Sequence, residues 1–167
     1  MKLTHLAVAA ALSVSAVSAS AATTAWGAHD PLEFGGGFVV GSFAALSDIF
    51  TFTLSSLSRV TATAVSNESA TLDLANAMVT LFSGPVGSGT FVSAFGFNKT
   101  SLSSTISPLN PGSYYYAVTG TVGAGAVAGS YALTSQVVVV PEPGTYALML
   151  AGLGAVGWVA ARRRTRA

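Results

Sequence analysis

The stretch "DIFTFTL" (Asp48 to Leu54) decides the fold, because its apolar residues recur at every second position. In an extended chain, Phe50, Phe52 and Leu54 point to one side, and the residues between them point to the other. A helix would instead need apolar residues with a period near 3.6. The stretch therefore predicts a strand that buries one face.

Similar runs follow this strand, and Gly, Pro, Asn and Ser separate them. They predict an all-β domain over residues 34–140, a small antiparallel β-sandwich of jelly-roll-like type with seven or eight strands. In "TFVSAFGF", Phe91, Phe95 and Phe97 are expected on one face. The other runs are RVTATAV (59–65), AMVTLF (77–82), SLSSTI (101–106), SYYYAVTG (113–120) and SYALTSQVVVV (130–140).

Three segments interrupt this strand pattern. Residues 22–33 have little periodicity and are expected to form a flexible leader. "FGGGF" (34–38) and "VGSGT" (86–90) are interpreted as turns, since neither has the Lys and the strand-to-helix context of a phosphate loop. "SATLDLANAMVTLF" is expected to split into two strands around Ala75-Asn76.

The N-terminus has the pattern of a secretory signal peptide over residues 1–21. Lys2 precedes a short apolar run, which is followed by small residues with Ala19 and Ala21 at the −3 and −1 positions. Cleavage is expected after Ala21 or Ala22, and the two remain open alternatives. The Sec translocon and signal peptidase are the partners that this segment predicts.

Composition limits the class of protein to which the chain can belong. The protein has 167 residues, of which 51% are hydrophobic and 8% charged, and it has no cysteine, so no disulfide holds the fold. Between residues 22 and 140, two basic residues face five acidic ones, a net charge of −3. A mildly acidic domain offers no basic surface for nucleic acid.

No arrangement for catalysis emerges from the sequence. His29, beside Asp30, is the one histidine that would remain after signal cleavage, and it is expected to be an exposed polar residue next to a turn proline. The spacing of the five carboxylates singles out no pair for glycoside hydrolysis. The protein is therefore predicted to be non-enzymatic, with no catalytic residue and no cofactor.

An adhesion module that binds carbohydrate or calcium is the alternative function. Asp48 and Asp73 are weak candidates for a calcium site built with loop carbonyls, because no D-x-D-x-D run accompanies them. Four tyrosines are expected to pack in the core, although an exposed row of them would favour stacking on sugars. They are Tyr114, Tyr115, Tyr116 and Tyr131.

The C-terminal segment, residues 141–167, combines three features in order. A Pro-Glu-Pro motif, an uncharged run over 146–161 and a basic tail over 162–167 follow one another. As a helix the uncharged run would be about 24 Å long, which makes a marginal membrane anchor against about 30 Å of hydrocarbon. Four arginines are expected to stop the span on the cytoplasmic side, namely Arg162, Arg163, Arg164 and Arg166.

This tail, "VPEPGTYALMLAGLGAVGWVAARRRTRA", resembles the PEP-CTERM sorting signal of Gram-negative bacteria that make exopolysaccharide. The resemblance implies transient recognition of Pro141, Glu142 and Pro143 by an exosortase and cleavage near this motif. It also implies an exported, inner-membrane-anchored precursor that is delivered to the cell surface or the extracellular matrix, among extracellular polysaccharides.

The body resembles the F-x-D-x-F type of such proteins in the stretch "LSDIF", where Leu46 stands in place of the first Phe. That type brings no catalytic residues with it. The later "LNPGSYYYAVTGTV" and "GSYALTSQV" resemble the end of a bacterial pre-peptidase C-terminal type of β-sandwich. Both resemblances imply the same fold as the strand pattern.

Overall fold

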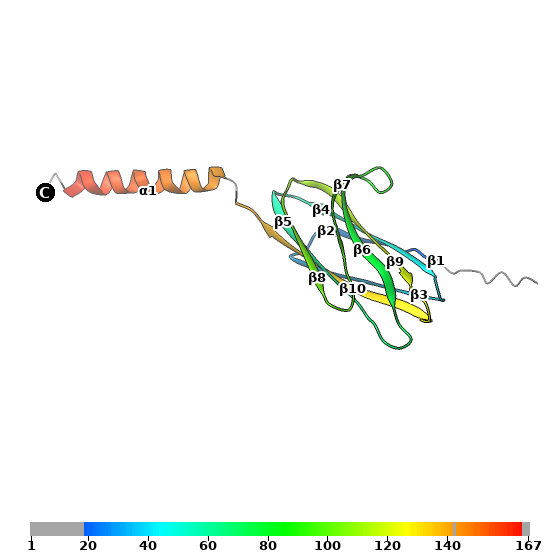
Figure 1. Ribbon diagram of the computed structural model, residues 1–167. Coiled ribbons are helices and arrows are strands. Elements are labelled where there is room, and N and C mark those ends of the chain that lie inside the picture. The colour runs from blue at the N-terminus through cyan, green and yellow to red at the C-terminus, as the bar shows by residue number, and fades with distance from the viewer. Residues whose placement is uncertain (1–18, 142, 165–167) are drawn as a thin grey trace, which may run out of the picture.

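The computed structural model describes residues 19–141 and 143–164. Over these residues, ten strands pack as two facing sheets, and one helix extends from one end of the sandwich (Figure 1). The predicted all-β sandwich followed by an apolar helix is confirmed, with more strands than the seven or eight expected. Most of the predicted signal peptide, residues 1–18, lies outside the described residues.

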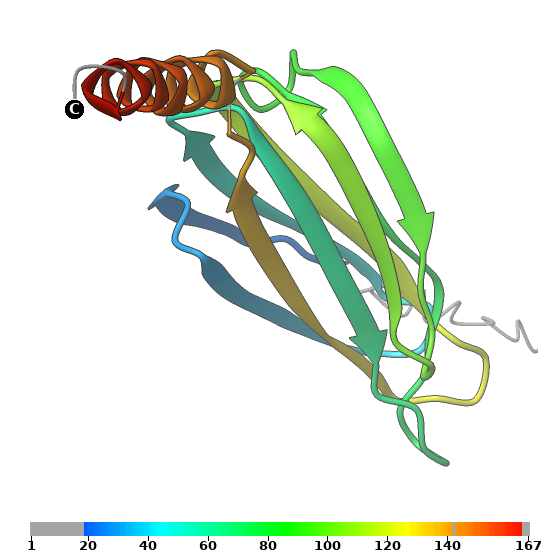
Figure 2. The same ribbon diagram turned by 90° about the vertical axis from the view of Figure 1, so that its left-hand side faces the viewer.

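The two sheets differ in strand order. The first has the order β1-β4-β9-β6-β7, with β2 also paired to β4, and the second has the order β3-β10-β5-β8. Strands of both sheets run along the long axis of the sandwich (Figure 2). Their bounds are β1 Ala19–Ser20, β2 Thr23–Ala28, β3 Leu32–Val40, β4 Ala45–Leu54, β5 Ser58–Ser66, β6 Leu74–Ser83, β7 Thr90–Gly96, β8 Leu102–Leu109, β9 Gly112–Val122 and β10 Ala128–Val139.

Strand β4 confirms the period of two that predicted it. Phe50, Phe52 and Leu54 are buried, while the residues between them are half-buried or exposed. The strand pairs antiparallel with β9 along its whole length, from Ala45 opposite Thr121 to Leu54 opposite Gly112. This pair places four aromatic side chains in the space between the sheets, those of Phe50, Phe52, Tyr114 and Tyr116.

The core contains both aromatic and aliphatic side chains. Phe52 packs against Tyr114 and Tyr116, with ring centroids 5.8 and 5.2 Å apart. No side-chain polar atom buried in the described residues lacks a hydrogen-bond partner. Among the largest fully buried side chains are Leu46, Leu74, Leu81, Leu133, Val60, Val79, Val118 and Val122.

The flexible leader expected over residues 22–33 is wrong. Thr23–Ala28 forms β2, which pairs parallel with β4, and Leu32 begins β3. Trp26 anchors β2, because its ring lies 5.0 Å from that of Phe50 and contacts the core. The pairings of β1 and β2 with β4 are parallel, so the first sheet is not purely antiparallel.

The interpretation of "FGGGF" as a turn is also wrong, because these residues lie inside β3. A Cβ atom on Gly35 would come within 2.5 Å of the Phe50 ring, and one on Gly37 within 2.1 Å of the Asp48 carboxylate. Glycine is needed here because β3 approaches the side chains of β4 closely. Glycines in "VGSGT" do form a turn, where Gly87 has a φ of 86°.

Bulges explain two further differences from the predicted strands. The pairing of β6 with β7 shifts between Leu81 and Phe82, so Phe91 turns outward and is 61% exposed while Phe97 is buried. The expected shared face of Phe91, Phe95 and Phe97 is therefore wrong. Strand β6 is continuous through Asn76, whose φ of 53° accompanies an irregularity in the pairing with β9, rather than being split there.

Candidate functional site

The sorting motif lies at the junction between the sandwich and the helix. The last backbone hydrogen bond of the sandwich runs from Val140 N to Leu57 O, over 2.9 Å. Pro141 follows it and is exposed, and Pro143 is the first residue of helix α1 (Pro143–Arg164). Glu142, the centre of the motif, lies outside the described residues. The junction is therefore both short and accessible at Pro141.

Helix α1 is longer than the run over 146–161 from which it was predicted. It has 22 residues, which corresponds to about 33 Å. A 20-residue part of it, Gly144–Arg163, is long and apolar enough to cross a membrane, and none of it is buried against the sandwich. The helix extends beyond the predicted run at both ends, because neutral residues before Tyr146 and arginines after Ala161 continue it.

The predicted membrane stop forms the C-terminal end of this helix. Arg162 lies over the Trp158 ring, 4.6 Å from its centroid. Arg163 is exposed in the same turn, and Arg164 is the last helical residue. Arg166 lies outside the described residues. Guanidinium groups at one end of an apolar helix give it a preferred orientation in a membrane.

His29 does not have the exposed position that was expected. Its Nε2 lies 2.8 Å from Ser135 Oγ, its Nδ1 contacts the backbone carbonyl of Asp30, and its ring packs edge-on against Phe52. Ser135 Oγ also lies 3.0 Å from the hydroxyl of Tyr116, whose pKa is raised by burial. Ser135 is fully buried, and no hydrogen bond to a carboxylate of residues 19–141 or 143–164 orients the imidazole, so these contacts link the end of β2 to β10.

Asp48 and Asp73, the weak calcium candidates, are not arranged as one site. Asp48 is buried in β4, and both its oxygens accept hydrogen bonds, from Ala22 N and from the Tyr131 hydroxyl. Asp73 instead lines a cavity of about 290 Å³ together with Glu68. Among the described residues, no group of three or more His, Cys, Asp or Glu side chains could hold a metal ion.

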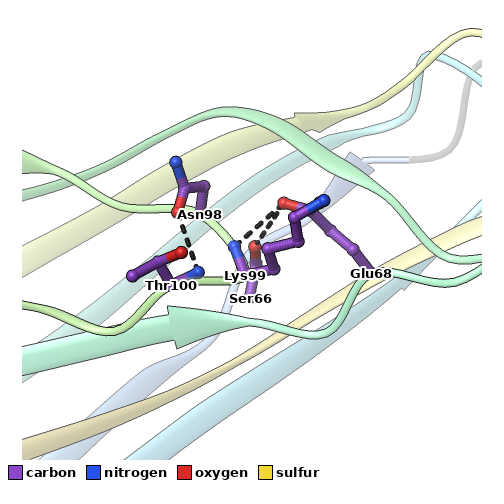
Figure 3. Close-up of polar contacts among 5 residues, drawn as sticks. All are labelled: Ser66, Glu68, Asn98, Lys99 and Thr100. Carbon is purple, nitrogen blue, oxygen red and sulfur yellow. Dashed lines mark hydrogen bonds and ion pairs between the residues drawn. The ribbon is translucent and has the colours of Figure 1, made fainter.

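Glu68 connects two loops at one end of the sandwich (Figure 3). Its Oε1 accepts hydrogen bonds from Lys99 N and Ser66 Oγ, and its Oε2 lies 3.6 Å from Lys99 Nζ. Asn98 Oδ1 accepts a hydrogen bond from Thr100 N in the same turn. Both Glu68 oxygens are thereby engaged within the fold, which favours a structural role for this carboxylate.

All four tyrosines are buried, and three of them lie in the core as predicted. Tyr114, Tyr116 and Tyr131 belong to the core cluster. Tyr115, on the opposite face of β9, is buried by stacking on Phe82 with ring centroids 4.9 Å apart. None of the four forms the exposed row that would favour a sugar-stacking platform.

The buried pair of Asp48 and Tyr131 was missed at the sequence level, although a signal for half of it was present. Asp48 has the same parity along β4 as Phe50 and Phe52, so the period of two already places it inward. Its partner lies 83 residues away, and no local pattern connects the two. Only the structure could therefore identify the partner of this buried carboxylate.

An accessible, proline-bounded junction, an unburied apolar helix and an arginine end together are the features of a C-terminal segment that can span a membrane. Residues 139–164 match the family described as "PEP-CTERM protein-sorting motif". In carrying this motif, the chain is a PEP-CTERM protein, and it fits a membrane-anchored precursor of an exported protein. The F-x-D-x-F type stays a prediction.

Solved structures similar to this chain are β-rich domains. The pre-peptidase C-terminal domain of collagenase from Bacillus anthracis is 15% identical with a TM-score of 0.49, covering 68% of this chain and 94% of that domain. The periplasmic g-type lysozyme inhibitors PliG of Salmonella Typhimurium and Aeromonas hydrophila are each 13% identical, with TM-scores of 0.38 and 0.41. They cover 69% and 71% of this chain, and 98% and 100% of their own. The comparison with curated protein sequences finds no match.

Proposed function

We propose that the chain is a non-enzymatic surface or matrix protein, exported by its N-terminal signal and trimmed by an exosortase at Pro141-Glu142-Pro143. Signal peptidase and the Sec translocon act before the exosortase does. The trimmed sandwich leaves the inner membrane for the cell surface or the matrix. There it associates with extracellular polysaccharide.

One observation supports the proposed trimming. The sandwich completes its hydrogen bonding just before the sorting motif begins. The last bond, from Val140 N to Leu57 O, precedes Pro141 by one residue. The helix beyond Pro143 has no buried surface against the sheets. Cleavage between these points would remove the anchor without removing a strand or a core side chain.

Deletion of the exosortase from the native host tests the trimming. We expect the full C-terminus to remain on the protein, which then stays in the membrane fraction, as intact mass and fractionation would show. Substituting Pro141, Glu142 and Pro143 with alanine in an unmodified host should have the same result. Alanine at Pro108 and Pro111, two prolines of the sandwich, is the matched control. Unchanged mass and location in the deletion strain would reject the proposal.

Neutral polar surface supports the association with polysaccharide. On the outer face of the second sheet, Thr61 and Thr63 of β5 pair through their hydroxyls with Thr105 and Ser103 of β8, at 3.0 and 2.9 Å. A cavity of about 240 Å³ on the first sheet is lined by three residues with hydroxyl groups, Thr51, Thr53 and Ser113, and by apolar residues that include Pro85 and Val86. Hydroxyl groups beside apolar residues match the hydrogen bonding and the apolar ring faces of neutral sugars.

Co-sedimentation of the processed protein with the host's purified exopolysaccharide tests this association. We expect binding that weakens when Thr51→Val and Ser113→Ala are combined, since these changes remove hydroxyls with little change in shape. Thr121→Val, on the half-buried face of β9 away from the cavity, is the control. Absence of binding by the unmodified protein would reject the matrix part and leave the trimming untouched.

The alternative, a carbohydrate- or calcium-binding adhesion module, has less support. The tyrosine row and the pairing of Asp48 with Asp73 were its two distinguishing features, and the tyrosines are buried while both Asp48 oxygens are engaged. A glycan array, read with and without calcium, separates it from the leading proposal. Calcium-dependent binding to a defined glycan would favour the alternative.

A further inference from the structure

Asp48 is a buried carboxylate that forms no ion pair with any described residue. It is 3% exposed and lies in the middle of β4. Its Oδ2 accepts a hydrogen bond of 2.9 Å from the Tyr131 hydroxyl, and its Oδ1 accepts one of 3.0 Å from the backbone N of Ala22. Burying a carboxylate without a cation nearby costs free energy, so this position calls for a further explanation.

The surroundings of Asp48 are shaped for a charged group. Gly37 leaves the space that Oδ2 occupies, since a Cβ atom there would lie 2.1 Å from this oxygen. The pKa of Tyr131 is raised by burial, and further by its hydrogen bond to Asp48 and by the charge of that residue. Tyr131 therefore remains a hydroxyl donor to the carboxylate over the ordinary pH range.

Both backbone polar groups of Ala22 form hydrogen bonds with residues of β4. Its carbonyl oxygen accepts a hydrogen bond of 2.7 Å from Ile49 N, while its own N points to Asp48. The residue itself is exposed and lies between β1 and β2, immediately after the predicted −1 residue Ala21. The one atom that signal cleavage after Ala21 would convert to an amine is thus already in contact with the buried carboxylate.

We propose that signal peptidase cleaves the Ala21–Ala22 bond and that the new α-ammonium of Ala22 becomes the cationic partner of Asp48. Hydrolysis adds water across this bond, leaving a carboxylate on Ala21 and an amine on Ala22, and the amine takes up a proton at neutral pH. This inference rests on the proposed export signal. It also chooses between the two cleavage positions, because cleavage after Ala22 would remove the atom that contacts Asp48.

Formation of this pair makes the mature fold dependent on its processing. A neutral peptide N–H donates to Asp48 before cleavage, and a charged N–H donates afterwards, which adds the attraction between opposite charges to this hydrogen bond. The loss of β1, whose two residues pair with Ala45 and Leu46, accompanies this gain. Asp48 thus serves as a binding site for the N-terminus that export creates.

The first arm of the test identifies the N-terminus. The full gene is expressed with its own signal in a Gram-negative host, and the protein is purified in detergent with its C-terminal helix and analysed by intact mass and N-terminal sequencing. We expect a chain that begins at Ala22. A chain beginning at Thr23 would overturn this inference and leave the export signal standing, whereas one beginning at Met1 would overturn both.

The second arm measures the reactivity of the α-amine in the same preparation. An amine paired with a carboxylate has a raised pKa, so its labelling by a succinimidyl ester at pH 7 should be about tenfold slower than in Asp48→Asn. Asp30→Asn, which removes an exposed carboxylate from the same part of the chain, should leave the rate unchanged. Equal rates in the unmodified protein and Asp48→Asn would overturn the pairing.

A third measurement needs no variant, in case Asp48→Asn does not fold. The labelling rate of the unmodified protein is followed against pH, since the groups that contact this amine are Asp48 of β4 and, through it, Tyr131 of β10. A midpoint about one unit above the 7.7–8.0 of a free peptide amine is expected. A midpoint equal to that of the free amine would overturn the proposal.

Discussion

The sandwich and helix α1 are both rich in apolar residues but arrange them in opposite ways. In the sandwich, large apolar side chains lie between two sheets, and no buried side-chain polar atom of the described residues lacks a partner. In α1 the apolar side chains cover the whole circumference, and none is buried. A helix that is apolar on every side is stable when it has an apolar solvent around it.

The difference indicates that the two regions depend on different surroundings. The sandwich carries its own core, so its stability should not require the helix. The helix has no buried surface against the core, and its apolar circumference suits a membrane. Substitutions that affect one region should therefore leave the other unchanged.

The largest effect is expected for Phe52→Ala. The ring of Phe52 lies within 6.2 Å of four other rings, those of Trp26, His29, Tyr114 and Tyr116. Its removal should lower the free energy of unfolding by about 3–5 kcal/mol, measured by urea denaturation. Phe34→Ala, at a site that is 68% exposed, should change it by less than about 0.5 kcal/mol. Loss of membrane association in either variant would contradict the separation.

Leu153→Arg tests the opposite region. Leu153 lies in the middle of α1, and an arginine there should make membrane insertion less favourable by about 3 kcal/mol. We expect the precursor to shift toward the soluble fraction, while the urea midpoint of the sandwich stays the same. Leu153→Ala is the control for the loss of the side chain. A lowered urea midpoint would show that the helix supports the sandwich.

The same substitution, glycine to alanine, can be made in both regions and its effects compared. A methyl group at Gly37 would meet the Asp48 carboxylate, so Gly37→Ala should destabilise the sandwich by about 1–3 kcal/mol. At Gly152 in α1 nothing lies within 4 Å, so Gly152→Ala should have no effect on the sandwich. Thermal unfolding of both variants provides the measurement. Equal melting temperatures would mean that β3 can move away from β4 without cost.

Tyr131→Phe should have the smallest effect at neutral pH. It should lower the free energy of unfolding by about 1–2 kcal/mol, because Asp48 keeps its second hydrogen-bond donor. The pKa of Tyr131 is raised in the folded protein, so the unfolded chain releases this proton first as the pH rises. Stability from this group is present below about pH 10 and is lost above it. Urea midpoints between pH 8 and 11 should therefore fall less steeply in Tyr131→Phe than in the unmodified protein.

Local patterns in the sequence were enough to predict much of the architecture. The alternation in β4 and β9 identified strands and their buried faces, and the three parts of the tail identified the sorting motif that the family comparison confirms. These features are contained in short stretches. They can therefore be recognised without knowing which residues pack against them.

The features that were missed depend on contacts between distant segments. Thr23–Ala28 has weak periodicity and becomes a strand because Trp26 packs on β4. Glycines 35 and 37 favour a turn locally, yet they lie in a strand because the Phe50 ring and the Asp48 carboxylate occupy the space of their missing side chains. His29 reaches Ser135, 106 residues away, and Ala22 reaches Asp48. Such pairs leave no signal in a single stretch of sequence.

The short connection between β10 and α1 also restricts which proteases could act on the precursor. Between the last hydrogen bond of the sandwich, at Val140, and the first residue of the helix, Pro143, the chain has room for about 10 Å of extended backbone. Soluble proteases engage several extended residues in their clefts, so a folded body on one side and a bilayer on the other should hinder them. An enzyme embedded in the same bilayer could approach from the helix side. We therefore expect the spacing to slow the release of the precursor by soluble proteases.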